Sequence, residues 1–187
     1  MITRMILTLA GLMMVASMSA SAAPFKLTSP TLVEGGTMPM AHVFNGMGHH
    51  GQNHSPAFAW SGTPAGTKSF AITCHDPDAP SPDAPRPGGW WHWLAFDIPA
   101  TTTGLAENAS AGSMPPGSVQ SMTDFGQPGY GGSAPPPGKP HRYIFTVYAL
   151  KVDKLGLGAG DTMAKVDAAI RKNALASSSI TVKFGHP

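Results

Sequence analysis

Five prolines fall between Pro77 and Pro87, within the stretch HDPDAPSPDAPRPGGWWHW that runs from His75 to Trp93. Each proline fixes its own φ, lacks a backbone N–H donor and restricts the residue before it, so neither a helix nor a paired strand can continue through this stretch. The chain has 22 glycines and 19 prolines among 187 residues, which divide it into short segments. Such a chain is expected to be rich in loops and built on β-strands rather than on helices.

Short runs of alternating apolar and polar residues lie between these turns and predict strands. One helix is expected in TMAKVDAAIRKNALA, where Met163, Val166 and Ile170 follow helical spacing and Asp161 can cap the first turn. The pattern predicts a mainly β fold, an antiparallel β-sandwich or barrel with one or two minor helices. The predicted strands are Phe25–Pro30, Pro56–Trp60, Lys68–Asp76, Trp91–Pro99, His141–Leu150 and Ser179–Phe184.

The first 22 residues follow the pattern of a secretory signal peptide. Arg4 precedes an apolar run from Met5 to Ala16, and Ala20-Ser21-Ala22 fits the A-x-A cleavage rule. The run is shorter than the roughly 20 apolar residues that span a bilayer, although a membrane anchor or a buried first strand are alternatives. We expect 1–22 to be removed and 23–187 to form one periplasmic domain without an integral membrane segment.

Charge and cysteine content limit the partners and the sources of stability. Charged residues make up 12% of the chain, the net charge is +2, and no block of like charge occurs, so nothing favours binding to nucleic acid. Cys74 is the one cysteine of the sequence, so no internal disulfide can form. We expect it to be a buried, inert thiol, because it ends an alternating apolar run.

The proline-rich segment connects two predicted strands and places polar side chains near their ends. Asp76 ends the first strand, and His92 lies near the start of the second, with Trp90 on the same face by alternation. The same alternation predicts that Trp91 and Trp93 point to the opposite face and lie in the core. Rigid proline walls lower the entropy cost of ordering a binding cavity.

A second Gly- and Pro-rich segment, GYGGSAPPPGKPHRY, leads into the strongest predicted strand. His141 and Tyr143 are two residues apart, so their side chains share a face of that strand. Open backbone N–H groups of the glycines favour the approach of an anion. We expect both segments to converge on one cavity.

The two segments resemble the signature regions of the phosphatidylethanolamine-binding protein family, most closely those of its bacterial Raf-kinase-inhibitor-like branch of the YbhB/YbcL type. NHSPAFAWSGTPAGTKSFAI and FDIPA support the resemblance, which covers Phe25 to about Leu150. It implies an antiparallel β-sandwich with a pocket for phosphate-like anions and phospholipid head groups. Carried over residue by residue, it assigns the pocket to Asp76, Pro80, Trp90, His92, Pro135, Pro136, His141 and Tyr143.

The resemblance also suggests supporting roles. Arg142 is expected to stabilise the loops by pairing, Asp78 to brace them through backbone hydrogen bonds, and Ala79–Pro80 to be a cis peptide. Eukaryotic members carry a tyrosine where this chain reads Arg86-Pro87-Gly88-Gly89, and they have a C-terminal extension with pocket residues. Head-group selectivity therefore does not follow from the resemblance.

Together these observations predict a non-enzymatic periplasmic binding protein with a small anion pocket and no cofactor or metal. Two alternatives stay open. One is an inhibitor of a kinase or protease that acts through the pocket rim. The other is a weak hydrolase that uses Asp76, His92 and His141 for acid–base chemistry, although the sequence has no G-x-S-x-G elbow.

Histidine chemistry gives two further expectations. Imidazoles with an unperturbed pKa near 6.5 gain charge in mild acid, so phosphate binding should weaken as pH rises, with Asp76 accepting a hydrogen bond from one ring. His49, His50 and His54 match no established zinc spacing, so they are expected to lie in a solvated loop rather than to bind metal.

Overall fold

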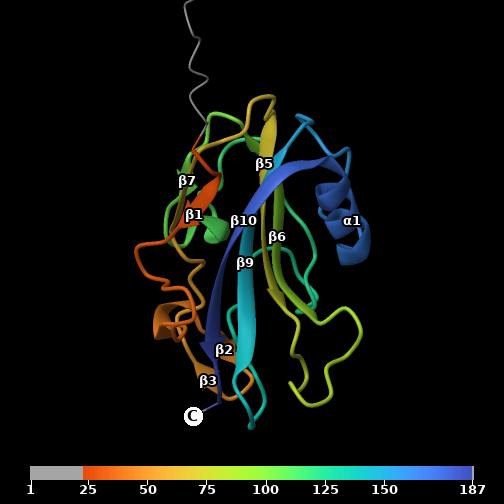
Figure 1. Ribbon diagram of the computed structural model, residues 1–187. Helices are drawn as coiled ribbons and strands as arrows, with labels where there is room; N and C mark the ends of the chain where they lie inside the picture. The colour runs from red at the N-terminus through yellow and green to blue at the C-terminus, as the bar shows by residue number, and fades with distance from the viewer. Residues whose placement is uncertain (1–22, 187) are drawn as a thin grey trace, which may run out of the picture.

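The central sheet of the molecule (Figure 1) contains the long apolar segments Ser69–Asp76, Trp90–Pro99 and His141–Leu150. In the computed structural model, which describes residues 23–186, its strands are all antiparallel and have the order β10-β9-β5-β6-β8. Branched and aromatic side chains make these segments strong strand formers. The strands are β5 (Ser69–Asp76), β6 (Trp90–Pro99), β8 (Val119–Gln120), β9 (His141–Leu150) and β10 (Ala174–Phe184).

A smaller sheet covers one face of the central sheet. Its order is β1-β4-β7, and the core between the sheets includes contacts of Trp60 with Phe70 and of Phe58 with Phe145, at ring-centroid distances of 5.2 and 5.3 Å. Cys74 is buried in this core as predicted, and burial raises the pKa of its thiol. The predicted antiparallel β-sandwich is therefore confirmed. The remaining elements on this side are β1 (Lys26–Thr28), η1 (Met40–His42), β2 (Asn45–Gly46), β3 (His49–His50), β4 (Phe58–Ser61), β7 (Gly104–Leu105) and η2 (Ala109–Ala111).

Helix α1 (Met163–Asn173) packs on the other face of the central sheet (Figure 1). Val166 and Ile170 are fully buried there, as their spacing predicted. The predicted cap was wrong, because the side chain of Thr162, not Asp161, accepts a hydrogen bond from the Lys165 amide, at 3.4 Å. The Asp161 carboxylate instead accepts from the Gly158 amide and the Lys165 ammonium group.

The boundary between α1 and β10 also differs from the prediction. The helix ends at Asn173 and β10 begins at Ala174, whereas the pattern placed a helix up to Ala176 and a strand from Ser179. Ala174 lies opposite Leu150 and the pairing continues to Phe184, so hydrogen bonding to β9 determines the conformation of residues that have good helix propensity.

Two bulges decide which side chains of β6 face the sandwich core. Cys74 lies opposite Trp93 but His75 lies opposite Trp91, so His92 is an extra residue in the strand. The extra residue reverses the alternation, and Trp93 is buried between the two sheets while Trp91 packs on the α1 side. The prediction that Trp93 lies in the core is confirmed, but its predicted orientation away from the His92 side is wrong. Trp91 faces away from that side as predicted but is only half-buried. A second bulge falls at Asp97, whose φ is 57°.

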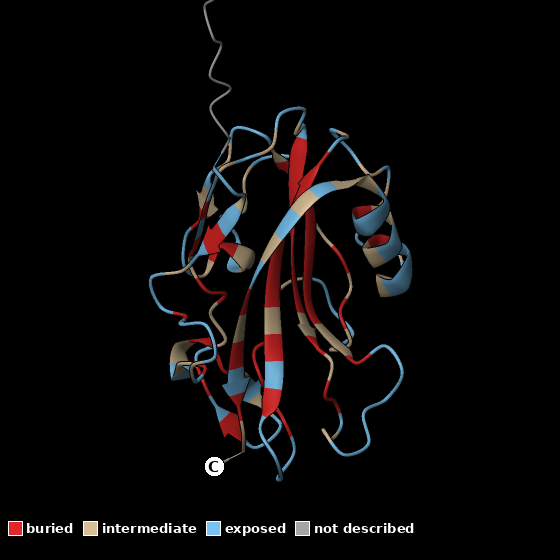
Figure 2. Ribbon diagram, in the orientation of Figure 1, coloured by how far each residue is buried: buried red, intermediate tan, exposed pale blue. Residues whose placement is uncertain are grey.

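Burial follows this layered arrangement (Figure 2). The central strands are largely buried, whereas the proline-rich loop after β5 is mostly exposed. No helix within residues 23–186 is long and apolar enough to cross a membrane. The predicted signal peptide, 1–22, lies outside the described residues, so its boundary stays a prediction.

Candidate functional site

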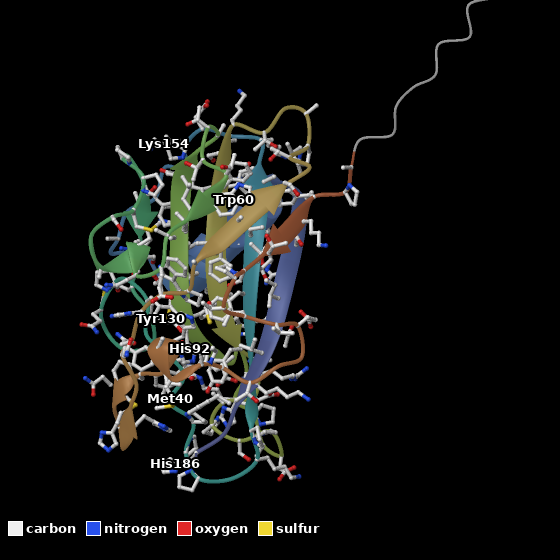
Figure 3. The ribbon with its side chains drawn as sticks, turned by 90° about the vertical axis from the view of Figure 1, so that its left-hand side faces the viewer. Met40, Trp60, His92, Tyr130, Lys154 and His186 are labelled. Carbon is white, nitrogen blue, oxygen red and sulfur yellow. The ribbon has the colours of Figure 1, made fainter. Side chains whose placement is uncertain are left out.

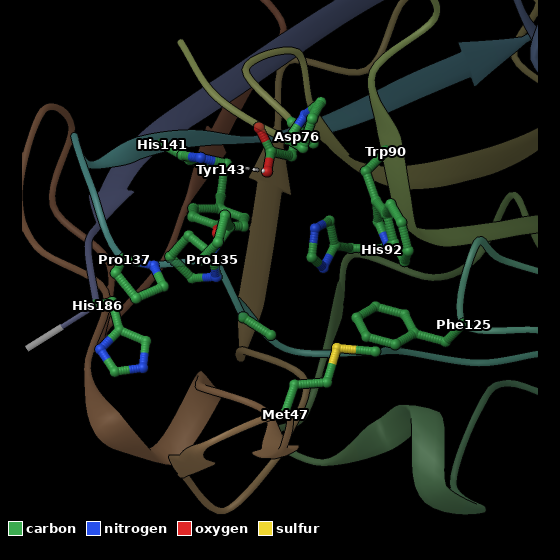
Figure 4. Close-up of a pocket in the computed structure, with 14 residues that line it drawn as sticks. Met47, Asp76, Trp90, His92, Phe125, Pro135, Pro137, His141, Tyr143 and His186 are labelled. Atoms are coloured by element: carbon green, nitrogen blue, oxygen red, sulfur yellow. Dashed lines mark hydrogen bonds and ion pairs between the residues drawn. The ribbon is translucent and has the colours of Figure 1, made fainter. Parts of the chain in front are cut away.

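A cavity of about 350 Å³ lies at the end of the central sheet where β5 ends and β6 and β9 begin (Figure 4). The Gly- and Pro-rich segments that precede β6 and β9 form much of its wall. All eight residues assigned to the pocket from the sequence line this one cavity. The full lining consists of Met47, Asp76, Ala79, Pro80, Trp90, His92, Phe125, Ala134, Pro135, Pro136, Pro137, His141, Tyr143 and His186.

His92 is oriented by backbone carbonyl groups. Its Nδ1 lies 2.8 Å from the Gly131 oxygen and 3.1 Å from the Gly132 oxygen, so Nδ1 carries a proton and donates to both. The ring therefore leaves Nε2 for the cavity. Burial lowers the pKa of His92, and this effect is only partly offset by the carbonyl hydrogen bonds and the charge of Asp76. His92 is also the bulge residue of β6, and bulges commonly re-aim a side chain next to a functional site.

His141 is oriented by a carboxylate instead. Its Nδ1 lies 2.8 Å from Oδ2 of Asp76, and both side chains are almost fully buried (Figure 4). Oδ1 of Asp76 accepts a hydrogen bond of 2.8 Å from the Asp78 amide, which fixes the carboxylate. The expected bond between Asp76 and a histidine ring is thus present, and Nε2 of His141 makes no hydrogen bond to a described residue.

A second carboxylate holds the two segments together behind the cavity. Asp78 accepts hydrogen bonds from the backbone amide, Nε and Nη2 of Arg142, at 2.9, 2.9 and 2.7 Å. The hydrogen bond from the guanidinium group of Arg142 lowers the pKa of Asp78. The expected roles of both residues are therefore seen in the structure, and the Ala79–Pro80 peptide is cis as predicted.

The aromatic wall of the cavity contains two polar atoms without good partners. Nε1 of Trp90 is buried and makes no hydrogen bond to the described residues. The hydroxyl of Tyr143 lies near the Ala134 backbone but makes no hydrogen bond of good geometry within 23–186. Burial raises the pKa of Tyr143, so its hydroxyl stays protonated and can donate. Buried donors are usually satisfied, so these two suit a ligand that brings acceptors.

Arg86 stabilises this wall from outside. Its guanidinium carbon lies 4.8 Å from the centre of the Trp90 ring, and Nη2 lies 2.6 Å from Oδ1 of Asp124. Asp124 also accepts a hydrogen bond of 2.6 Å from the Trp91 amide. Arg86 lies in the region where eukaryotic members carry a tyrosine. Through Asp124, it connects the proline-rich loop to the segment that carries Phe125.

Besides Ala79, Ala134 and Pro137, which lie within the two predicted segments, three lining residues were not predicted: Met47, Phe125 and His186. Met47 lies in the β2–β3 hairpin, and His186 lies at the end of the described chain, near Pro137 (Figure 4). Phe125 contacts the rings of Trp90 and His92, with centroid distances of 5.5 and 5.3 Å. They reach the cavity through tertiary packing, and no local motif marks them in the sequence.

The histidine-rich loop differs partly from its prediction. His49 is buried, and its Nε2 lies 3.0 Å from the Pro135 carbonyl oxygen, so its assignment to a solvated loop is wrong. His50 is exposed, and His54 is half-exposed with Nδ1 3.6 Å from Glu107. Among residues 23–186, no group of three or more His, Cys, Asp or Glu side chains is arranged to hold a metal ion. Figure 3 shows His186 below His92, at the same end of the sandwich.

The chain is similar to proteins of one family. The family model described as phosphatidylethanolamine-binding protein matches residues 28–185. Two Escherichia coli K12 proteins are similar in sequence: UPF0098 protein YbhB is 48% identical over 85% of this chain and 99% of its own, and UPF0098 protein YbcL is 44% identical over 87% and 88%.

Solved structures give the same result. The crystal structure of E. coli YbcL, described as a new member of the mammalian PEBP family, matches with a TM-score of 0.82 at 43% identity, over 88% of this chain and all of that chain. A PEBP homolog from Chlamydia trachomatis matches with a TM-score of 0.74 at 28% identity, over 89% of this chain and all of that one. The resemblance predicted from the two signature segments is confirmed.

Proposed function

Because the chain belongs to the phosphatidylethanolamine-binding protein family, we propose that it is a binding protein whose cavity takes a phosphate group, either free or in a phospholipid head group. One observation carries the proposal. Two imidazoles from different strands line one cavity, and each has its Nδ1 engaged by the protein, so that Nε2 remains for a ligand. A phosphate between the two rings would complete both sets of hydrogen bonds, with a separate oxygen facing each Nε2.

The charge of the cavity favours a weakly charged ligand. None of the described lining residues is Lys or Arg, and Asp76 contributes a carboxylate. Because the pKa of His92 is lowered, its neutral ring accepts at Nε2 near neutral pH and would pair with a P–OH group. A singly protonated phosphate, or a head group that combines phosphate with an ammonium group, therefore fits better than a fully ionised phosphate.

A binding role fits the lining better than hydrolysis through a covalent intermediate. Of the described lining residues, none is Ser, Thr or Cys, and the hydroxyl of Tyr143 has a raised pKa that disfavours its use as a nucleophile. The Asp76–His141 pair resembles the acid–base half of a triad, but the lining supplies no third member. Phosphoester turnover that is lost in Asp76→Ala would contradict a purely binding role.

Isothermal titration with inorganic phosphate and with phosphoethanolamine tests the proposal. We expect His141→Ala to weaken binding by about 10- to 100-fold, the loss expected for one hydrogen bond to a charged group. His50→Ala removes an exposed histidine outside the cavity and is the matched control. Equal affinities for His141→Ala and wild type, or no binding of either ligand by wild type, would refute the assignment.

We also propose that the protein acts in the periplasm. The support is the sequence of 1–22, with Arg4, the apolar run and the A-x-A site. Mass spectrometry of the protein from a periplasmic extract should give a chain that begins at Ala23. An unprocessed chain found in the cytoplasm would contradict this location.

A further inference from the structure

We propose that the outer face of the central sheet holds a second binding site, for the ring of a neutral sugar. A second cavity, of about 250 Å³, lies on the side of the sheet on which α1 packs. It shares no lining residue with the first cavity. Its lining consists of Thr73, His75, Trp91, Ile144, Thr146, Tyr148, Arg171, Ser177 and Ser179.

A row of hydroxyl groups forms the floor. Thr73 of β5 lies opposite Thr146 of β9, and Thr146 lies opposite Ser179 of β10. Neighbouring strands are about 4.8 Å apart, and residues in register point to the same side, so the three hydroxyls form a line across the sheet. The neighbouring row adds Tyr148 and Ser177, which also lie opposite each other.

Three of these five residues, Thr73, Thr146 and Tyr148, are unusually buried for the outer face of a sheet, whereas Ser177 and Ser179 are exposed. Polar side chains on such a face are normally exposed to water, but Thr73 is 2% and Tyr148 is 6% exposed. Neither hydroxyl makes a hydrogen bond to any residue in 23–186, although each keeps some contact with solvent through the cavity. Thr146 and Ser179 bond only to each other, at 2.8 Å. Buried polar groups are usually satisfied, so this floor is suited to a ligand rich in hydroxyl groups.

The walls of the second cavity provide an aromatic surface and a charged hydrogen-bond donor, both of which can contact a sugar. The rings of Trp91 and His75 lie 4.3 Å apart and form an aromatic edge, against which the C–H face of a pyranose can pack. On the other side, Arg171 is fixed through Nε by Asp167, at 2.9 Å, which leaves its remaining N–H groups as donors.

The size and charge of the cavity select among ligands. Asp167 offsets the charge of Arg171, so the site favours a neutral ligand over a phosphate. Cavities for drug-sized ligands occupy about 300–1,000 Å³, so this smaller one suits a single ring. Hydroxyl groups, which both donate and accept, complement those of a hexose.

Nuclear magnetic resonance titration of the full domain with glucose tests this site, with glycerol at equal hydroxyl concentration as the control. We expect saturable shifts of the amides of Thr73, His75 and Ser177, and little change with glycerol. Thr73→Val keeps the shape of the side chain and should weaken binding by about three- to tenfold, as for the loss of one hydrogen bond. Thr181→Val, on the same strand as Ser179 but outside the lining, should bind as wild type.

Two sets of results would overturn the proposal. The first is that glucose and glycerol cause the same unsaturable shifts, or that glucose shifts only the first cavity. The second is that phosphate, and not glucose, shifts the amides of the second cavity. Ser177→Ala removes an exposed hydroxyl and should also weaken binding. Ser177→Ala therefore serves as the test if Thr73→Val does not fold. If either variant folds and binds glucose with the affinity of the wild type, the site is refuted.

Discussion

His92 and His141 face the same cavity, but different chemistry orients them. His141 depends on a single carboxylate, whereas His92 depends on two backbone carbonyls that no side-chain substitution removes. Both histidines could be identified from the sequence because each follows a rigid Gly- and Pro-rich segment. The unpaired hydroxyl of Tyr143 could not, because its lack of a partner depends on the packing of the segment around Ala134.

Tyr143→Phe should separate binding from stability. The hydroxyl makes no good hydrogen bond to the described residues, so its removal should leave the free energy of unfolding unchanged or slightly higher. Affinity for phosphate should fall by about three- to tenfold, because a donor is lost. Tyr130→Phe is the matched control, since that hydroxyl donates to the His42 carbonyl at 2.7 Å. It should lower stability and leave affinity unchanged; the reverse pattern would refute the role of Tyr143.

At the scale of elements, the strands of three or more residues could be predicted, whereas the two-residue strands β2, β3, β7 and β8 and the irregularities could not. Every predicted strand is present, because alternation and β-branched residues are local signals. The bulge at His92 could not be predicted from the sequence, because the tryptophans on both sides of it can pack on either face of the sheet. The start of β10 was missed for a related reason: its pairing partner, β9, is distant in sequence.

The Asp78–Arg142 contact joins the loop after β5 to the start of β9, so its loss should loosen the cavity. Asp78→Asn should lower the free energy of unfolding by about 1–3 kcal/mol, because hydrogen bonds to a buried charged group are lost. Asp83→Asn breaks only the exposed pair with Lys139 and should change stability by less than about 0.5 kcal/mol. Urea denaturation of both variants measures the difference, and equal losses would contradict this role of Asp78.

For the whole molecule, buried histidines link stability to pH. Burial lowers the pKa of both His42 and His92 below the ordinary value of 6.5. Below about pH 6.5 the unfolded chain therefore binds protons that the folded chain does not, and the free energy of unfolding falls. It should be nearly constant from pH 8 to 7 and decrease from pH 6.5 to 5. Denaturation midpoints that rise on acidification would contradict this linkage.

Phosphate binding should have the opposite dependence on pH. Protonation of His92 would add a charged donor to the cavity, and the lowered pKa places this gain below pH 6.5. Asp76 and Asp124 are the carboxylates whose charges favour it. Affinity measured at pH 5.5 should therefore exceed that at pH 8, and equal affinities would rule out a role for imidazole charge. The unpredicted lining residues Met47, Phe125 and His186 also depend on the whole molecule, since only the complete fold brings them to the cavity.

The central claim is that the Nε2 atoms of His92 and His141 bind one phosphate together. The most direct test is a long-range ¹H–¹⁵N spectrum of the imidazole rings, recorded with and without inorganic phosphate. The account predicts that both rings carry a proton on Nδ1 and that both Nε2 resonances shift with the same saturation curve. If only one Nε2 responds, or if the two respond with different affinities, the two rings do not share a ligand.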